Sequence, residues 1–389
     1  MRKTTLEKIA PNITSGSRGW ASFYSDEGAL FLRMTNLPKT GIGLLLHDNK
    51  YVKLPEGSSE GRRTRIQVND ILISITAELG KVGFINRDLG EAYVNQHVAL
   101  VRIEDPKTHP KYLAQYLASQ PERNRLNRLN DSGAKAGLSL RTINRFPVIL
   151  PPLPEQKAIA DLLTTWDKAI EKTERLIQAK EKQFKWLLRE LISEPRNTQK
   201  NTEWKKVKLG EVCKLYQPQT ISKDDMNDAG AYKVFGANGV IGFYDKYNHE
   251  RSEIAITCRG ATCGTLNKTE PKSWITGNAM IAQPNEELIQ KNYLYYSLLR
   301  TNMKATISGA AQPQITRQDL APLLILLPPL EEQQQIAETL STAQQEINLL
   351  KQLAEKYKTQ KRGLMQKMLT GEWRVKPEIV DQYVEKNHE

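Results

Sequence analysis

The side chains that could do chemistry in this 389-residue chain do not form a catalytic pattern. The sequence contains no phosphate-binding Gly-x-x-x-x-Gly-Lys-Ser/Thr loop and no Asn-Pro-Pro-Tyr/Phe motif of amino-methyltransferases. A glycine-rich run from Gly236 to Gly242 leads into residues that do not open a helix, which argues against a dinucleotide-binding turn. Asp70 with Glu78 and Lys81 only faintly resembles a nuclease cluster, and a strand followed by a turn explains them better. We predict no catalytic residue.

Metal-binding residues are equally scattered. The five histidines, at positions 47, 97, 109, 249 and 388, have neither ligand spacing nor triad spacing. Cys258 and Cys263 are separated by four residues, but no second Cys or His pair nearby completes a zinc site. Three cysteines in a chain of this size do not make a disulfide framework, so we expect them to be reduced. The sequence therefore predicts no metal and no cofactor.

The charge of the chain points to a binding function. Net charge is +12 and the pI is about 9.4, which favours a polyanionic partner such as nucleic acid over a neutral one. Residues 1–150 carry 22 Lys and Arg against 14 Asp and Glu, and residues 204–327 carry 15 against 11. The N-terminus lacks a signal-peptide core, and the apolar run 320–330 is too short to span a bilayer. We expect a cytoplasmic protein.

Candidate contacts to double-stranded DNA follow from the same residues. Arg, Lys, Asn and Gln read base edges in the major groove, whereas phosphates require only positive charge and amides. Taken singly, each such residue is more often an ordinary surface side chain, and groups carry more weight. The candidates are Arg62, Arg63, Arg65, Arg123, Arg125, Arg128, Lys135 and Arg141 in the first half, and Lys233, Asn238, Arg259, Gln312, Gln314 and Arg317 in the second.

Two similar regions must position these residues. Residues 1–150 contain β-rich runs at 71–75 and 98–101 and a helical pattern at 111–129. Residues 204–327 show the same pattern, with strands expected at 254–257 and 279–282 and a helix at 291–303. Each half is therefore predicted to be an α+β domain, within a chain long enough for about two to three domains.

A repeated motif joins each region to a long charged segment. Leu-Pro-Pro-Leu-Pro-Glu-Gln at 150–156 returns as Leu-Pro-Pro-Leu-Glu-Glu-Gln at 327–333, a shift of 177 positions. This is no solenoid period of about 20–50 residues, so it indicates two copies of a whole domain-plus-helix unit with pseudo-two-fold symmetry.

The segments after the motif carry apolar residues at alternating steps of four and three, the pattern of a coiled-coil seam. Each predicted helix is about 55–60 Å long at ~1.5 Å per residue. Because each follows its own domain, a two-fold arrangement makes the helices antiparallel and turns them into a ruler between the domains. The predicted seam consists of Ile159, Leu163, Trp166, Ile170, Ile177, Phe184, Leu187, Leu191, Ile336, Leu340, Ile347, Leu350, Tyr357, Leu364 and Met368.

The C-terminal tail resembles the start of a domain. Glu372-Trp373-Arg374-Val375 matches the Glu203-Trp204 stretch that leads into the second domain, so we expect the tail to dock beside the first domain. A frayed tail is the alternative. The predicted boundaries are residues 1–150 for the first domain, 151–193 for the first helix, 194–203 for a linker, 204–327 for the second domain, 328–370 for the second helix and 371–389 for the tail.

Two strand-rich domains, each ended by Leu-Pro-Pro-Leu-x-Glu-Gln and a long helix, resemble the specificity subunit of type I restriction–modification systems over the full length. In that family the domains are target recognition domains that each read one half of a split, asymmetric DNA sequence. The resemblance implies that the paired helices set the gap between half-sites and dock two methyltransferase subunits, and that restriction subunits join the assembly. It implies a non-catalytic subunit. The alternatives are a self-contained DNA-processing enzyme with an unrecognised active site, and a coiled-coil scaffold without affinity for DNA.

Overall fold

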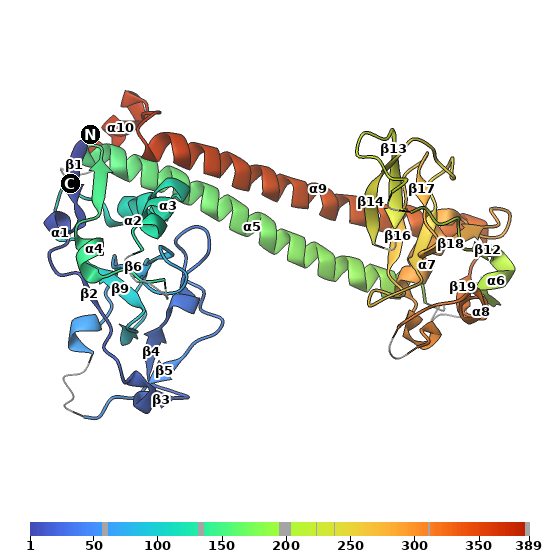
Figure 1. Ribbon diagram of the computed structural model, residues 1–389, viewed down its shortest axis with the longest axis horizontal. Coiled ribbons are helices and arrows are strands. Elements are labelled where there is room, and N and C mark those ends of the chain that lie inside the picture. Colours follow the sequence, from blue (N-terminus) through green and yellow to red (C-terminus); the bar gives the residue numbers. More distant parts are fainter. Residues whose placement is uncertain are drawn as a thin grey trace. The chain divides into compact units, whose positions relative to one another are not determined.

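The computed structural model divides the chain into two compact units, Met1–Lys172 with Ala354–Glu389, and Thr173–Leu353. Two long helices, α5 (Leu153–Leu191) and α9 (Leu330–Leu369), each contribute to both units (Figure 1). The structure describes residues 1–56, 61–130, 136–193, 204–222, 224–236, 238–309 and 312–385. The linker predicted at 194–203 and the candidate contact Lys135 lie outside these residues.

The first unit combines small sheets with short helices. Its sheets have the strand orders β1-β10, β2-β9-β6-β7 and β3-β5-β4-β8. Its elements, besides the long helices, are β1 (Arg2–Thr5), α1 (Leu6–Ile9), β2 (Thr14–Ser15), η1 (Trp20–Phe23), β3 (Tyr24–Ser25), β4 (Ala29–Leu32), η2 (Met34–Asn36), β5 (Tyr51–Val52), η3 (Arg62–Thr64), β6 (Ile71–Ser74), β7 (Val82–Phe84), β8 (Ala92–Val94), β9 (Val98–Val101), α2 (Pro110–Ala118), α3 (Gln120–Arg128), α4 (Leu140–Asn144), β10 (Pro147–Leu150) and α10 (Pro377–Glu385).

The central strand β6 shows why this unit is layered. All four of its residues are buried, and successive side chains of a strand point to opposite faces. Ile71 and Ile73 pack with α2 residues in one apolar cluster, whereas Leu72 packs with β4 and β8 residues in another. The sheet is therefore covered by helices on one face and by the second sheet on the other, which explains its continuous apolar sequence.

One predicted helix is two helices in the structure. The sequence pattern predicts a helix over residues 111–129, but α2 ends at Ala118 and α3 begins at Gln120. Pro121 occupies the first turn of α3, where its missing N–H costs nothing, and Ser119 adopts an extended conformation between the two helices. A helix continuing through Pro121 would lose a backbone hydrogen bond, so the chain turns here.

The second unit repeats the order of the first. Its sheets are β11-β19, β12-β18-β15-β16 and β14-β13-β17, so the first two copy β1-β10 and β2-β9-β6-β7 strand by strand. The predicted helix 291–303 ends earlier, because α7 stops at Arg300 before a short 3-10 turn. The elements are β11 (Lys205–Lys208), α6 (Leu209–Val212), β12 (Cys213–Tyr216), β13 (Tyr232–Gly236), β14 (Gly239–Tyr244), β15 (Ile254–Thr257), β16 (Leu266–Lys268), β17 (Trp274–Ile275), β18 (Ala279–Pro284), α7 (Lys291–Arg300), η4 (Met303–Thr306), α8 (Arg317–Leu320) and β19 (Leu324–Leu327).

Within each unit the long helices pack against each other and against the domain core. In the first unit, Ile159 and Leu163 of α5 share a cluster with Met368 of α9 and with α2 residues. In the second, Phe184 of α5 and Ile347 of α9 join α7 in a cluster. In both units α5 and α9 run in opposite directions where they pack against each other (Figure 1). Among the described residues, no helix is both long enough and apolar enough to cross a membrane.

Candidate nucleic-acid interface

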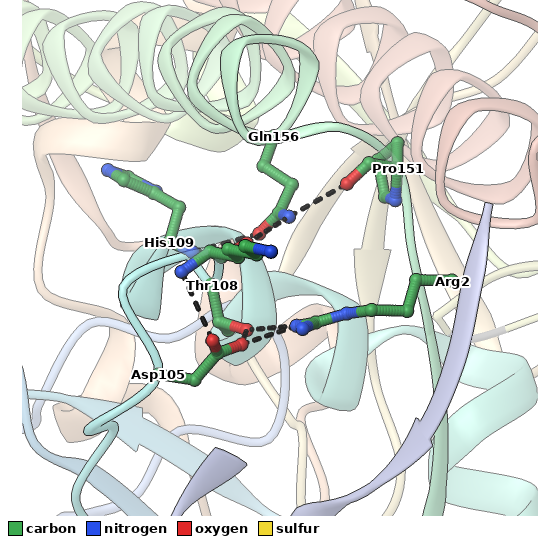
Figure 2. Close-up of polar contacts among 7 residues, drawn as sticks. Arg2, Asp105, Thr108, His109, Pro151 and Gln156 are labelled. Carbon is green, nitrogen blue, oxygen red and sulfur yellow. Dashed lines mark hydrogen bonds and ion pairs between the residues drawn. The ribbon is translucent and has the colours of Figure 1, made fainter. Parts of the chain in front are cut away.

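The glutamine of the repeated motif fastens the long helix to its domain. Gln156 is 1% exposed and lies in the first turn of α5. Its Oε1 accepts a hydrogen bond from the His109 backbone N–H at 2.8 Å, while its Nε2 donates to the carbonyls of Lys107 (3.0 Å) and Pro151 (2.8 Å) (Figure 2). Arg2 of β1 forms an ion pair with Asp105, which lies in the same loop as Lys107 (Figure 2).

The second unit repeats this arrangement atom for atom. Gln333 is fully buried, and its Oε1 accepts from the Gln290 backbone N–H at 2.8 Å. Its Nε2 donates to the carbonyls of Leu288 (3.1 Å) and Pro328 (2.8 Å). Residue 109 caps α2 as residue 290 caps α7, so each motif holds a long helix against the N-terminus of a domain helix. The motif therefore fixes where each domain is attached.

The glutamate before each glutamine has a partner from another segment. The Glu155 carboxylate is 4% exposed and accepts two hydrogen bonds from the Arg374 guanidinium, at 2.6 and 2.5 Å. In the second unit, Trp204 Nε1 donates to Glu332 Oε2 at 3.0 Å. Tyr383 of α10 also donates to Asp161 Oδ2 at 3.0 Å. The tail thus contacts α5 within the first unit, with Arg374 supplying the ion pair.

The predicted seam residues belong to α5 and α9. Each of them is buried or half-buried. Trp166 meets the edge of Tyr357 at 5.7 Å between ring centroids. Lys361 occupies an apolar position of the pattern, and its side chain, 11% exposed, pairs with Asp167 at 2.5 Å. In the second unit, Lys180 pairs with a glutamate of α9 at 2.8 Å.

The candidate contacts of the first unit differ in exposure and in intrachain partners, and Arg63, although exposed, already donates to the Ser15 carbonyl at 3.3 Å and to Ser17 Oγ at 3.5 Å. Arg62 and Arg63 lie on η3, and both are exposed together with Arg65, as are Arg128 at the end of α3 and Arg141 on α4. Two other candidates already have partners within the unit. Arg125 donates to Glu122 at 2.6 Å and lies over the Phe146 ring, and Arg123 donates to the Lys39 carbonyl.

The second unit gathers three candidates in one hollow. Arg259, Gln314 and Arg317 line a cavity of about 350 Å³, which we name the basic hollow. Tyr216, the last residue of β12, and the following Gln217 also line it, and its described lining residues include no carboxylate. A β-bridge between residues 259 and 314 holds two of the walls together. The hollow thus presents guanidinium and amide groups side by side, the donors that suit phosphates and guanine edges.

Local structure explains the position of Arg317. Thr316 caps the single-turn helix α8, and Asp319 closes a reciprocal capping box. The hydrogen bonds from Thr316 lower the pKa of Asp319, so this carboxylate stays charged within its own turn. The side chain at 317 is left exposed at the helix start.

The remaining candidates of the second unit lie on or beside other elements. Asn238 sits in the turn between β13 and β14, where its side chain accepts from Thr257 Oγ1 at 3.5 Å. Lys233 of β13 pairs with Glu270 at 2.6 Å, and Gln312 is exposed. Sequence reasoning missed Gln217, whose amide donates to Cys258 Sγ at 3.1 Å, because Cys258 lies 41 positions away and Gln314 and Arg317 lie farther still.

Comparison with known proteins identifies the architecture. The family described as "Type I restriction modification DNA specificity domain" matches residues 37–181 and 201–358, more than half of the chain. A Methanocaldococcus jannaschii protein, proposed to be the type I restriction enzyme MjaX specificity subunit, is 26% identical over 346 residues, covering 80% of each chain.

Solved structures agree on the fold. The S subunit of a type I restriction–modification system from M. genitalium superposes with a TM-score of 0.65 at 16% identity, over 95% of this chain and 96% of that one. A chain from a structure of type I restriction–modification complex assembly gives a TM-score of 0.58 at 18% identity, over 94% and 96%. The predicted fold class, two mixed α/β domains with two long packed helices, is confirmed.

Proposed function

Because the chain belongs to the family of type I restriction–modification DNA specificity subunits, we propose that its two domains each read one half of a bipartite, asymmetric DNA site. As a specificity subunit it is a non-catalytic component, which leaves catalysis to its partners. The observation that carries the proposal is a shared framework with unlike surfaces. The framework strands and motif glutamines repeat between the units, whereas the proposed contact surfaces differ: exposed arginines on and beside η3 in the first unit, and the basic hollow in the second.

In the second domain, the basic hollow is the proposed contact surface. Arg259 and Arg317 supply positive charge, and Gln314 supplies an amide that suits a base edge. In the first domain the exposed arginines Arg62, Arg63 and Arg65 are the proposed contacts. Arg123 and Arg125 already have intrachain partners and are weaker candidates than their sequence cluster indicates.

The long helices are proposed to set the gap between half-sites and to dock two methyltransferase subunits, which restriction subunits then join. Exposed apolar side chains support a docking role, because apolar surface left open on a helix favours a partner. Trp186 is 58% exposed on α5 and Leu349 is 57% exposed on α9. The proposed domain boundaries are residues 1–150 and 204–327, with the tail from 371 completing the first domain.

Exchanging residues 1–150 for those of another specificity subunit tests the two-reader arrangement. The methylated sequence is expected to change in one half only, because the second domain and both helices remain. Mapping methylated adenines in cells that carry the assembled system measures this. A change in both halves would contradict the proposal.

The basic hollow has its own test in the full complex. Arg259→Ala and Arg317→Ala are each expected to weaken DNA binding and to reduce the slope of log affinity against log salt by about 1. Arg300→Ala is the matched control, because Arg300 is exposed in the same domain but does not line the hollow. Equal effects of all three variants would show that only overall charge matters.

A further inference from the structure

A buried carboxylate of the first unit is fully neutralised by an arginine of the same sheet. Asp70 immediately precedes β6 and is 1% exposed. Arg102, immediately after β9, donates from Nε to Oδ1 at 2.8 Å and from Nη2 to Oδ2 at 2.7 Å. Hydrogen bonding to Asp70 raises the pKa of Arg102. A carboxylate buried this deeply requires such a partner.

The second unit has a carboxylate at the equivalent position but no arginine. Glu253 immediately precedes β15, and its carbonyl accepts from the Thr269 N–H at 3.0 Å, as the Asp70 carbonyl accepts from Ile85 at 3.0 Å. In the first unit Ile71 pairs with Val101, so continuing this antiparallel register by one residue sets Asp70 opposite Arg102. In the second unit Ala255 pairs with Ile281, so continuing by two residues sets Glu253 opposite Gln283. A glutamine therefore stands where the first unit has its arginine.

The glutamate is left incompletely satisfied. Glu253 is 7% exposed, and its Oε2 is buried without a hydrogen-bond partner among the described residues. Lys291 Nζ lies 3.7 Å from Oε2, close enough for an ion pair but too far for a hydrogen bond, and it donates instead to the Ser252 carbonyl. Burial raises the pKa of Glu253, and the charge of Lys291 opposes that rise.

Glu253 is among the residues that line a pocket of about 470 Å³, which we name the acidic pocket. Gln283, Glu250, Tyr216 and His249 also line it. The Tyr216 hydroxyl and His249 Nε2 are 3.0 Å apart, and the two rings are parallel within 13°. These two rings are the aromatic part of the lining, here called the Tyr216–His249 wall, and a planar cation stacks favourably on such rings. Lys214 Nζ already lies 5.5 Å from the Tyr216 ring centroid.

The charge around the pocket argues against DNA as its occupant. The residues that line the pocket include two carboxylates, Glu250 and Glu253, and one guanidinium, that of Arg251. Tyr216 also lines the basic hollow, whose described lining residues include two guanidinium groups and no carboxylate. The basic hollow therefore suits a phosphate backbone better, and the acidic pocket suits a cationic side chain better.

We propose that the acidic pocket receives the guanidinium of an arginine side chain carried by a protein partner, which takes the place that Arg102 fills in the first unit. A guanidinium can donate to Glu253 and stack on the Tyr216–His249 wall at once, which a lysine ammonium cannot do equally well. The identification of the partner as another subunit of the restriction–modification assembly rests on the proposed function. The preference of the pocket for a guanidinium does not depend on that function.

The pocket is tested first with a small probe on the full chain. N-acetylarginine amide is expected to give saturation-transfer NMR signals with the wild-type protein, and N-acetyllysine amide much weaker ones. Glu253→Gln removes the charged acceptor, and Gln283→Arg fills the position as Arg102 does. Both variants are expected to lose the arginine signal while melting at or above the wild-type temperature. Equal signals from wild type and both variants, or none from any protein, would overturn the inference.

Assembly with the methyltransferase and restriction subunits identifies the partner. Gln283→Arg is expected to weaken the binding of one subunit by about tenfold or more, since a competing arginine occupies the pocket. The methylated sequence should not change. If Glu253→Gln instead alters the base preference of one half-site and leaves subunit binding intact, the pocket reads a base and the inference is wrong. Failure of the DNA-reading proposal would be seen separately, as unchanged DNA binding in the Arg259 and Arg317 variants.

Discussion

Replacing Gln156 by methionine tests whether the repeated motif fastens the long helix to its domain. Methionine has nearly the shape of glutamine but makes none of its hydrogen bonds. The variant would leave one N–H, of His109, and two carbonyls, of Lys107 and Pro151, without these partners; the bond to Pro151 is buried and the other two are part-buried. Each orphaned group costs about 1–3 kcal/mol, with carbonyls toward the lower end, so the expected loss is about 3–6 kcal/mol.

That loss is a large share of the stability of one unit, which is typically about 5–15 kcal/mol. For about 200 residues, each kcal/mol corresponds to roughly 2–4 °C, so the melting temperature of the first unit should fall by roughly 6–24 °C. Differential scanning calorimetry of the full chain measures this. Gln333→Met should produce the same loss in the transition of the second unit, because Gln333 makes the same three hydrogen bonds.

The matched control is Gln335→Met, which changes an exposed glutamine in the first turns of α9. It is expected to shift the melting temperature very little. If Gln156→Met were no more destabilising than this control, the three buried hydrogen bonds would have no net value. The motif would then have to be explained by something other than attachment.

Four further substitutions probe ion pairs and pH, all followed by urea unfolding. Arg374→Gln leaves Glu155 buried with weaker partners and should cost about 1–3 kcal/mol. Lys361→Met should be neutral or stabilising, whereas Asp167→Ala, which leaves the lysine unpaired, should cost about 1–2 kcal/mol. The pKa of Glu253 is raised above its ordinary 4.5, so wild-type stability should decline as pH rises through the folded pKa, and Glu253→Gln should remove this decline.

Each of these has an outcome that contradicts it. If truncating the chain after residue 371 lowered the free energy of unfolding less than Arg374→Gln does, the tail would contribute no net stability to the first unit. If Lys361→Met lowers the free energy of unfolding more than Asp167→Ala does, the charge of Lys361 itself stabilises the fold. For Glu253, equal pH dependence of wild type and variant would show that Lys291 already neutralises the carboxylate in full.

The sequence predicts the architecture well because its strongest signals are repeated. The motif appears twice, and the apolar steps after it continue for more than four heptads, so the two long packed helices could be predicted from residues such as Ile159 and Ile336. The break at Ser119 was missed because apolar periodicity continues across it, and only Pro121 marks the new helix. Individual DNA contacts stay predictions.

Interactions set by strand register could not be predicted from the sequence. Asp70 and Arg102 are 32 positions apart, and no local spacing indicates that β6 and β9 bring them together. The same holds for Glu253 and Gln283. The sequence suggested that Asp70 belongs to a strand and turn, but its ion pair, and the absence of the equivalent arginine in the second unit, become apparent only from the sheet.

The composition of the first unit has a consequence for biosynthesis. Its core includes Met368 and Leu369, and Glu155 is paired with Arg374, so the unit cannot be completed until these residues have left the ribosome. The second unit needs nothing beyond Leu353. At about 5–20 residues per second, the roughly 200 residues that separate the two parts of the first unit take on the order of 10–40 s to synthesise. The N-terminal unit, although translated first, is therefore finished last, and a nascent chain stalled before α9 is complete would carry one finished domain and one open core.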